Sequence, residues 1–322
     1  MIKLYKGDCL IESDKIESGS VDLILTDLPY GTVKGMGGDM EKYKHLSNAD
    51  WDNVIDTNNI MQIANRILRK NGKMVLTANQ PFTTELISNA IPNLPHCYNM
   101  YWDKMHFANC LVANKAPVSY IEDVLVFSKM HEEKNTHPLA NYVKELQDKN
   151  NVYWNKEIAE YYYKNGFSKT FNNAKAVLKH FLNWEYVQFS LFTKQHYERL
   201  KYFFDFDKTH EELKQIDNQF KKKFASTFNL WEGNKYKSNI LKYKKDYDGH
   251  HPTQKPVLLL EDLIKTFSNE GDLVVDLTMG SGSTGVAAKQ TNRNFIGIEQ
   301  DDKYFDIAEK RIKETKQQTT LF

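Results

Sequence analysis

Short, largely apolar segments in the first 130 and the last 50 residues of the chain constrain its fold most strongly. Several of them, such as 21–27 and 123–129, are almost continuous apolar runs. Strands of this kind are covered on both faces, as in a parallel sheet. Segments with helical periodicity separate several of these runs, which predicts an α/β fold of the doubly wound kind. The seven predicted strands are 3–7, 21–27, 73–78, 98–103, 123–129, 273–276 and 294–299.

The middle of the chain, from about 132 to 247, has a different composition. It is rich in Lys, Asn, Tyr and Phe and has few strand-like runs. The segments 158–164, 173–184 and 194–204 have the pattern of helices. We therefore expect a helical insert between two fragments of one sheet.

Composition places the chain among soluble globular proteins. Of its 322 residues 41% are hydrophobic and 26% are charged, and the net charge is +1. Its apolar runs are far shorter than the roughly 18 residues of a membrane span, and its N-terminus lacks the apolar stretch of a secretory signal. Cys9, Cys97 and Cys110 form no CxxC pair, so we expect reduced thiols and a cytoplasmic protein. The histidines show no metal-ligand spacing, so we expect no metal.

A basic stretch from 214 to 245 is the first indication of a partner. It carries nine lysines against two acidic residues, with aromatic residues between them, a composition that suits a phosphate backbone and unstacked bases. The alternative is a solvated helix whose Phe220, Phe224 and Phe228, at a spacing of four, pack into a core. The lysines that we expect to face DNA are Lys221, Lys222, Lys223, Lys235 and Lys237.

A glycine-rich loop joins two predicted elements near the C-terminus. A strand ends at Asp276, the sequence GSGST occupies 280–284, a helix follows, and the next strand ends at Glu299. Glycines let the backbone approach a ligand, the helix N-terminus offers N–H groups to an anion, and Glu299 can accept hydrogen bonds from ribose hydroxyls. The ligand is a dinucleotide or S-adenosylmethionine. The lack of GxGxxG weakens the first choice, and the lack of GK[ST] argues against a nucleoside triphosphate.

Three motifs together resemble those of amino-group DNA methyltransferases. TDLPYG, residues 26–31, resembles the (D/N/S)PPY motif of that family. DLTMGSGST, residues 276–284, resembles its S-adenosylmethionine loop, and HPTQKP, residues 251–256, resembles a further element beside the methionine end of the cofactor. Their order along the chain is similar to that of the β class, a circular permutation of the common arrangement.

The resemblance implies an architecture with three parts. It is a permuted, seven-stranded, mostly parallel Rossmann-like methyltransferase sheet with a helical target-recognition insert. The catalytic half would be 1–131, the insert 132–245, and the S-adenosylmethionine-binding half 246–322.

The resemblance also implies roles for the TDLPYG residues. The Asp27 carboxylate and the Leu28 carbonyl would accept hydrogen bonds from the target amino group, and Tyr30 would stack on a base flipped out of the duplex. Pro29 would stiffen this wall. Leu28 replaces the usual proline, but the contact needs only its backbone oxygen.

Further residues are implied as cofactor contacts. Asp8 would accept from the adenine amine, with a strand-end turn as the alternative, and Thr253 and Lys255 would lie near the methionine carboxylate, with a loop before a helix as the alternative. We interpret Glu122 as structural. The implied cofactor set is Asp8, Thr253, Lys255, Asp276, Gly280, Ser281, Gly282, Ser283, Thr284 and Glu299.

The motif favours adenine N6 as the acceptor. Cytosine C5 transfer needs a nucleophilic cysteine, usually after proline, and each cysteine here follows another residue. Cytosine-N4 enzymes mostly carry serine where Asp27 stands, and glutamine- or RNA-modifying relatives generally have the cofactor loop first. The alternatives are cytosine-N4 transfer and a non-catalytic DNA-binding factor on this scaffold.

Expected partners follow from the same resemblance. They are double-stranded DNA and a cognate restriction nuclease, and the protein would be a monomer or a homodimer. Arg199 is the only arginine of the insert, so base reading there would depend on it together with Asn, Gln and Lys. The glycine-containing segment 32–52 is predicted to form a mobile loop over the substrate.

Overall fold

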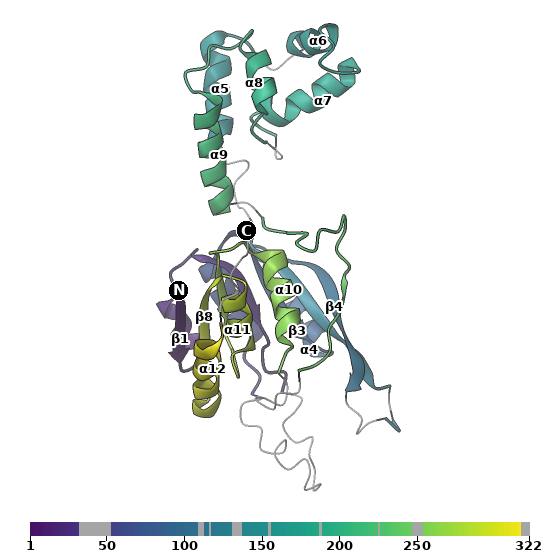
Figure 1. Ribbon diagram of the computed structural model, residues 1–322, viewed down its shortest axis with the longest axis vertical. Helices are drawn as coiled ribbons and strands as arrows, with labels where there is room; N and C mark the ends of the chain where they lie inside the picture. Colours follow the sequence, from purple (N-terminus) through teal and green to yellow (C-terminus); the bar gives the residue numbers. More distant parts are fainter. Residues whose placement is uncertain are drawn as a thin grey trace. The chain divides into compact units, whose positions relative to one another are not determined.

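The computed structural model describes residues 1–31, 53–108, 113–115, 117–130, 137–153, 156–186, 189–224, 226–246 and 254–316. The predicted loop 32–52 and Thr253 lie outside these residues. The chain forms two compact units (Figure 1). The sheet unit comprises Met1–Met130 and Ser226–Phe322, and the helical unit comprises His131–Ala225.

The sheet unit contains one sheet of eight strands in the order β1-β8-β7-β2-β3-β5-β4-β6. The neighbours from β1 to β3 are parallel, β5 is antiparallel to both β3 and β4, and β6 is parallel to β4. This confirms the predicted mostly parallel α/β sheet. The strands are β1 (Ile2–Lys6), β2 (Val21–Thr26), β3 (Leu68–Ala78), β4 (His96–Ala108), β5 (Ser119–Ser128), β6 (Ile240–Lys242), β7 (Leu273–Asp276) and β8 (Asn294–Glu299).

Helices cover both faces of the sheet, which explains the continuous apolar runs. In β2, Ile24 packs into a core with α3 and α4, whereas Leu23 and Leu25 pack into a second core with α10, α11 and α12 (Figure 1). All three side chains are fully buried. The helices of this unit are α1 (Cys9–Glu12), the short 3₁₀ helix η1 (Ser13–Lys15), α3 (Thr57–Ile67), α4 (Phe82–Ser88), α10 (Val257–Phe267), α11 (Ser283–Gln290) and α12 (Asp302–Glu314).

The two ends of the chain meet in the middle of the sheet. β2 pairs in parallel with β7, with Leu23 opposite Val274 and Ile24 opposite Val275. β2 continues the sheet toward β3, whereas β7 continues it toward β8 and β1. The carboxyl ends of strands from both halves of the sequence therefore lie along one edge, where ligands bind in open α/β sheets.

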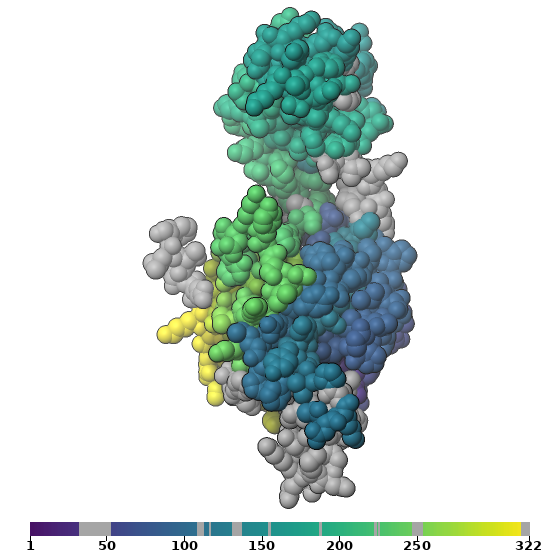
Figure 2. All heavy atoms as spheres, turned by 90° about the vertical axis from the view of Figure 1, so that its right-hand side faces the viewer, coloured from purple at the N-terminus to yellow at the C-terminus, as the bar shows by residue number. Residues whose placement is uncertain are grey.

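Two details of the prediction were wrong. The sheet has an eighth strand, β6, whose Ile240 lies opposite Tyr101 of β4. The helical unit ends at Ala225, so 226–245, which we expected in the insert, belongs to the sheet unit. The indole N–H of Trp102 also donates to the carbonyl of Tyr243 at 2.7 Å. We call residues 226–246 the returning segment. Figure 2 shows it together with α10, both in green, on the same surface as the blue residues of the first half.

The helical unit has its own core. Its helices were predicted in part from 158–164, 173–184 and 194–204, and each of these segments coincides largely with a helix. Phe220 is half-buried, with its ring 4.2 Å from that of His137, whereas Phe228 is 50% exposed and lies in the sheet unit, so the alternative of three core-facing aromatic residues was wrong for Phe228. The helices are α5 (Pro138–Asn150), α6 (Lys156–Lys164), α7 (Phe171–Leu182), α8 (Lys194–Leu200) and α9 (His210–Phe224).

Searches of the described residues for two further features were negative. No helix among them is long and apolar enough to cross a membrane. No group of His, Cys, Asp and Glu side chains among them is arranged to hold a metal ion.

Lys237 is a correction to the predicted DNA-facing lysines. Its side chain is 5% exposed, and its ammonium lies 2.5 Å from a carboxylate oxygen of Asp262, which is 2% exposed. Trp231 and Tyr243 donate to the same carboxylate. This ion pair links the returning segment to α10. Because the Lys237 ammonium is buried in it, the ammonium is unavailable to a phosphate.

We therefore predict that Lys237→Ala lowers the free energy of unfolding by about 3–5 kcal/mol, because Asp262 stays buried without its counter-ion. Lys235→Ala is the matched control, since Lys235 is exposed, and it should change the value by less than about 0.5 kcal/mol. Urea denaturation of the full chain measures both. Equal stability of the two variants would contradict the structural role of the pair.

Candidate active site

The candidate catalytic residue Asp27 directly follows β2. Its backbone carbonyl accepts a hydrogen bond from the Thr278 hydroxyl at 3.0 Å, and Thr278 belongs to the loop after β7. In the preceding position, the Thr26 hydroxyl donates to Asp276 at 2.7 Å. These contacts hold the TDLPYG segment against the glycine-rich loop, so the two motifs lie together as the sequence analysis expected.

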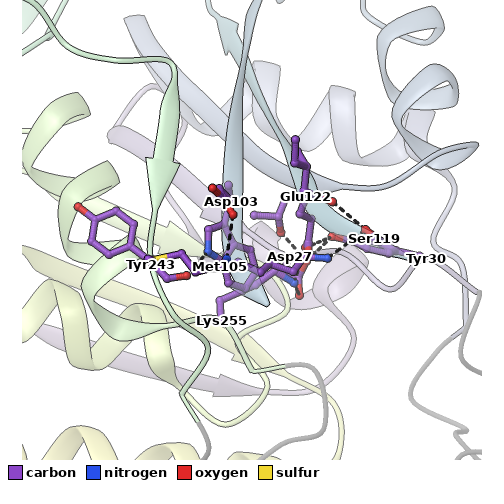
Figure 3. A network of polar contacts seen from close by, with 12 residues as sticks. Asp27, Tyr30, Asp103, Met105, Ser119, Glu122, Tyr243 and Lys255 are labelled. Atoms are coloured by element: carbon purple, nitrogen blue, oxygen red, sulfur yellow. Dashed lines mark hydrogen bonds and ion pairs between the residues drawn. The ribbon is translucent and has the colours of Figure 1, made fainter. Parts of the chain in front are cut away.

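The Asp27 carboxylate accepts hydrogen bonds from three side chains. Tyr30 donates its hydroxyl to Oδ1 at 2.7 Å, and Thr77 of β3 donates to the same oxygen. The Lys255 ammonium lies 2.5 Å from Oδ2. Figure 3 shows Asp27, Tyr30, Glu122 and Lys255 gathered in this network. The carboxylate is thus held in one orientation by donors from three separate parts of the sequence.

A second carboxylate, Glu122 of β5, completes the network. Lys255 lies 2.9 Å from Glu122 Oε1, and Lys104 of β4 lies 3.4 Å from Oε2. The Tyr30 hydroxyl is 3.1 Å from Oε1 and shares its single proton between Glu122 and Asp27. Glu122, Lys104 and Lys255 are buried. Two carboxylates and two ammonium groups therefore balance their charges within one cluster, in which the Asp27 side chain is 28% exposed and the other three are buried.

This balance fixes the protonation states of the cluster. Burial alone would raise the pKa of the Glu122 carboxyl, but Lys255 and Lys104 outweigh it and hold the pKa below its ordinary value. Burial alone would lower the pKa of Lys255, whereas Asp27 and Glu122 raise it above its ordinary value. Burial, followed by the two carboxylates, raises the pKa of Tyr30 well above its ordinary value. Glu122 is therefore an anion, Lys255 a cation and Tyr30 a neutral donor at neutral pH.

The remaining TDLPYG residues build the wall around Asp27. Leu28 is buried in the core that contains α3 and α4, which explains why an aliphatic side chain suits this position. Pro29 and Tyr30 are half-buried. The Tyr30 ring lies 5.5 Å from that of Phe82 and 5.7 Å from the Lys255 ammonium.

The glycine-rich loop connects β7 to α11 next to this wall. Gly282 precedes α11 with a φ of 82°, a left-handed conformation that favours glycine. Asp276 is buried at the end of β7, and burial raises the pKa of its carboxyl to about 6. Ser281, Ser283 and Thr284 are also buried.

Glu299 lies on the other side of the loop, at the end of β8. Its carboxylate accepts from the backbone N–H of Gly280 at 2.8 Å and from that of Asp301 at 2.8 Å. Its backbone carbonyl accepts from the N–H of Gly7 at 2.9 Å, which places Asp8 at the end of neighbouring β1. Asp8 is exposed and caps α1 through the N–H of Leu10, the strand-end arrangement that was its alternative reading.

Sequence reasoning missed Thr77 and several further residues of the site, and it misjudged the partner of Lys255. Lys255 was expected beside a cofactor carboxylate, but its ammonium is paired with Asp27 and Glu122. Glu122 was interpreted as structural, and a carboxylate beside an apolar strand was the available signal. Lys104 gave no signal.

Arg311 and Gln254 are the other missed residues, and both contact the glycine-rich loop. Arg311 of α12 donates to the carbonyl of Ser281 at 2.6 Å and to its hydroxyl at 2.9 Å. Ser281 also donates to Gln254 Oε1 at 3.4 Å. The rarity of arginine in this chain could have drawn attention to Arg311, and Gln254 lies within the HPTQKP motif itself.

The predicted DNA contacts are divided between the two units. Lys235 is exposed, with its ammonium 5.2 Å from the Tyr236 ring centre. In the helical unit, Lys221 is paired with Asp217 at 2.8 Å, and the Arg199 guanidinium lies 4.0 Å from the Phe167 ring centre. The side chains of Lys222 and Lys223 lie outside the described residues.

The chain belongs to the DNA methylase family of the N6/N4 class, since the model of that family matches residues 21–310. The chain is 25% identical over 315 residues to the DNA adenine methyltransferase YhdJ of Escherichia coli strain K12, covering 96% of this chain and 82% of that protein.

Shorter segments are more similar to other relatives. The Type II methyltransferase M2.DpnII of Streptococcus pneumoniae is 43% identical over 84 residues, which are 26% of this chain and 30% of that protein. The Type II methyltransferase M.HinfI of Haemophilus influenzae is 49% identical over 74 residues, 22% of this chain and 21% of that protein. These matches span less than a third of those relatives.

Solved structures share the fold over almost the whole chain. The complex of M1.HpyAVI with SAM has a TM-score of 0.52 at 19% identity, covering 97% of this chain and 99% of that one. The PvuII DNA methyltransferase, described as cytosine-N4-specific, has a TM-score of 0.52 at 15% identity, covering 96% of this chain and 86% of that one.

We predict that Lys255→Met lowers the free energy of unfolding by about 3–5 kcal/mol at pH 7, because two carboxylates lose their shared counter-ion. Lys255 lowers the pKa of Glu122, so its stabilisation is present above the ordinary carboxyl pKa of 4.5 and is lost as the pH falls through the lowered value. The loss caused by the substitution should therefore be smaller near pH 4.

Two further variants make this prediction specific. Adding Glu122→Gln to Lys255→Met should restore part of the stability at pH 7, because one of the unpaired charges is removed. Lys6→Met is the control, since Lys6 pairs with Asp302 at the surface, where the two side chains are 47% and 83% exposed. A loss that did not depend on pH would contradict the charge balance.

Proposed function

We propose that this protein transfers a methyl group from S-adenosylmethionine to the N6 amino group of an adenine flipped out of double-stranded DNA. The observation that carries the proposal is the hydrogen bond from Thr278 to the Asp27 carbonyl. It joins a carboxylate suited to an amino group to a loop suited to a nucleoside ligand. Both lie at the carboxyl edge of the sheet, where β2 and β7 pair.

The residues around the loop fit S-adenosylmethionine. Gln254 Nε2 is buried and has no hydrogen-bond partner among the described residues. An unpaired buried N–H is costly, so a carboxylate or carbonyl of a ligand would relieve it. Glu299 would accept from the ribose hydroxyls and Asp8 from the adenine amine. When bound, the cofactor supplies an electrophilic methyl group on a positively charged sulfur.

Asp27 would act on the target amino group by hydrogen bonding. An exocyclic amine is a poor nucleophile because its lone pair is conjugated with the ring. Acceptors at the Asp27 carboxylate and the Leu28 carbonyl would draw the nitrogen toward tetrahedral geometry and direct its lone pair at the methyl group. Tyr30 and Thr77 hold the carboxylate in place before the base arrives, so little reorganisation is needed during the reaction.

Lys255 can release the Asp27 carboxylate to the target base because it has a second carboxylate partner. Its ammonium is shared between Asp27 at 2.5 Å and Glu122 at 2.9 Å. An incoming amino group competes with Lys255 for Asp27, and Lys255 keeps Glu122 as a partner when it yields. Lys255 and Glu122 are therefore positioning residues, and Asp27 is the catalytic residue.

Adenine is favoured over cytosine by the acid in TDLPYG and by the adenine activity in the name of the relative YhdJ. Cytosine-N4 transfer, the specificity named for the PvuII enzyme, is the second candidate. A non-catalytic DNA-binding factor is disfavoured because Asp27 is held by three donors beside an intact glycine-rich loop.

The wider setting of the reaction is part of the proposal. The helical unit would recognise the target sequence, as the insert of the β class does, and the target base would reach Tyr30 by flipping. A cytoplasmic location, a monomer or homodimer, and a cognate restriction nuclease as the functional partner remain predictions.

We predict that Asp27→Asn lowers kcat at least about 100-fold, because a preorganised anionic acceptor is lost at the reacting nitrogen. Asp302→Asn, at a side chain that is 83% exposed, is the control and should retain the parent rate. Transfer of labelled methyl groups to plasmid DNA measures both rates. An Asp27→Asn rate within twofold of the parent would exclude the proposed role.

We also predict that Gln254→Ala weakens binding of S-adenosylmethionine about 5- to 30-fold, the worth of one buried hydrogen bond. The melting temperature without cofactor should change little, because Nε2 has no hydrogen-bond partner among the described residues and the hydrogen bond from Ser281 to Oε1 is long, at 3.4 Å. Gln62→Ala, at an exposed position of α3, is the control. Unchanged affinity of Gln254→Ala in calorimetry would remove Gln254 from the cofactor site.

A further inference from the structure

A long stretch of the helical unit is free of acidic residues. Between Glu160 and Glu185 the chain has four lysines and no Asp or Glu. With 42 acidic residues in 322, a stretch of this length would carry about three by the chain's average. The stretch contains the end of α6, the connection 165–170 and the whole of α7. Positive potential is therefore concentrated on α7 and on the connection that precedes it.

α7 has one buried face and one exposed face. Ala174, Leu178 and Phe181 are buried in the core of the helical unit. The opposite face presents Asn172, Asn173 and Ala176, all exposed, followed by Val177, which is 42% exposed. The centre of the exposed face thus consists of two amides and small apolar side chains.

The lysines of α7 differ from those of the neighbouring helices. Lys164 of α6 lies 3.5 Å from Glu160, and on α8 Lys201 lies 2.9 Å from Glu198. Lys175 and Lys179 have no carboxylate within ion-pair distance among the described residues. Their ammonium groups lie over the rings of Phe171 and Tyr186, at 5.7 and 4.3 Å from the ring centres. Their charge is available to an anionic partner.

We propose that α7 enters the major groove of the target DNA, with Asn172 and Asn173 reading base edges and Lys175 and Lys179 contacting the flanking phosphates. This inference rests on the proposed function. Asparagine pairs with the N6 and N7 of adenine, and small apolar groups such as Ala176 contact the thymine methyl. The groove of B-DNA admits a helix, whereas the deep, narrow major groove of RNA does not.

The same arrangement revises the role expected for Arg199. Its guanidinium stacks on Phe167 in the connection between α6 and α7, so in this proposal it supports the start of α7 in place of reading a base. The connection 165–170 is longer than the three- or four-residue turn of the helix-turn-helix motif. The inference therefore depends on the surface of α7 and not on that motif.

Three variants of the full-length protein test the proposal. Asn172→Ala/Asn173→Ala should reduce discrimination between target and mismatched sites about 5- to 150-fold, as expected for loss of amide–base contacts. Lys175→Ala/Lys179→Ala should keep the sequence preference but reduce the salt dependence of binding, with the slope of log K against log salt falling by about two. Lys194→Ala/Lys201→Ala on α8 is the matched control and should change neither quantity.

The measurements are sequencing of methylated positions in DNA from a methylation-free host and titration of target duplexes at several salt concentrations. If the Asn172→Ala/Asn173→Ala variant has a lowered melting temperature, the Ala176→Glu variant is tested in its place. A carboxylate at this exposed position should repel the phosphates and abolish specific binding. Parental target choice and salt slope in all α7 variants would overturn the inference while leaving the proposed function in place.

The outcomes for the parent separate the two proposals. If the parent binds DNA without methylating it and the α7 variants weaken that binding, the inference stands and the proposed function fails. If the parent neither methylates nor binds DNA, both are overturned.

Discussion

The parallel pairing of β2 with β7 is the interaction on which the site depends. It joins segments that lie 250 positions apart, as the Thr26–Asp276 hydrogen bond shows. An acid lies at the carboxyl end of each strand, Asp276 as the last residue of β7 and Asp27 directly after β2, and the loops that follow meet along one edge of the sheet. Neither motif could form the site alone, because Asp27 lacks a nucleoside-binding loop in its own half of the chain. The order of the motifs in the sequence is therefore free to differ, provided that the two strands are neighbours.

Charge balance is the second requirement, and it comes from elements that flank this pairing. Glu122 and Lys104 lie on the antiparallel strands β5 and β4, and Lys255 lies just before α10. A buried carboxylate without such partners would be neutralised or would destabilise the fold. The cluster keeps Glu122 ionised and Tyr30 protonated, so Asp27 faces donors of known charge. The same physical rule explains Lys237 and Asp262, where a buried pair fastens the returning segment and serves no ligand.

The sequence was informative wherever structure depends on neighbouring residues. Continuous apolar runs predicted seven strands, because burial on both faces leaves a local pattern. TDLPYG and GSGST were recognised because each motif is contiguous. β6 was missed, since three residues of which only Leu241 is buried leave no pattern. Glu122 and Lys255 could not be paired from the sequence, because the contact joins distant segments and depends on the sheet order. The surface of α7 leaves a weaker signal of a different kind, because it is marked by an absence of acids, whereas the lysines nearer 221 are denser.

The identity of the methylated nucleoside tests the central claim most directly. DNA is incubated with the protein and S-adenosylmethionine carrying an isotopically labelled methyl group, and is then digested to nucleosides for mass spectrometry. The account predicts label in N6-methyldeoxyadenosine and in no other nucleoside. Label in N4-methyldeoxycytidine would contradict the choice of base while keeping the site. Absence of label from every nucleoside, with S-adenosylmethionine bound, would contradict the claim that Asp27 and the glycine-rich loop form a DNA-methylating site.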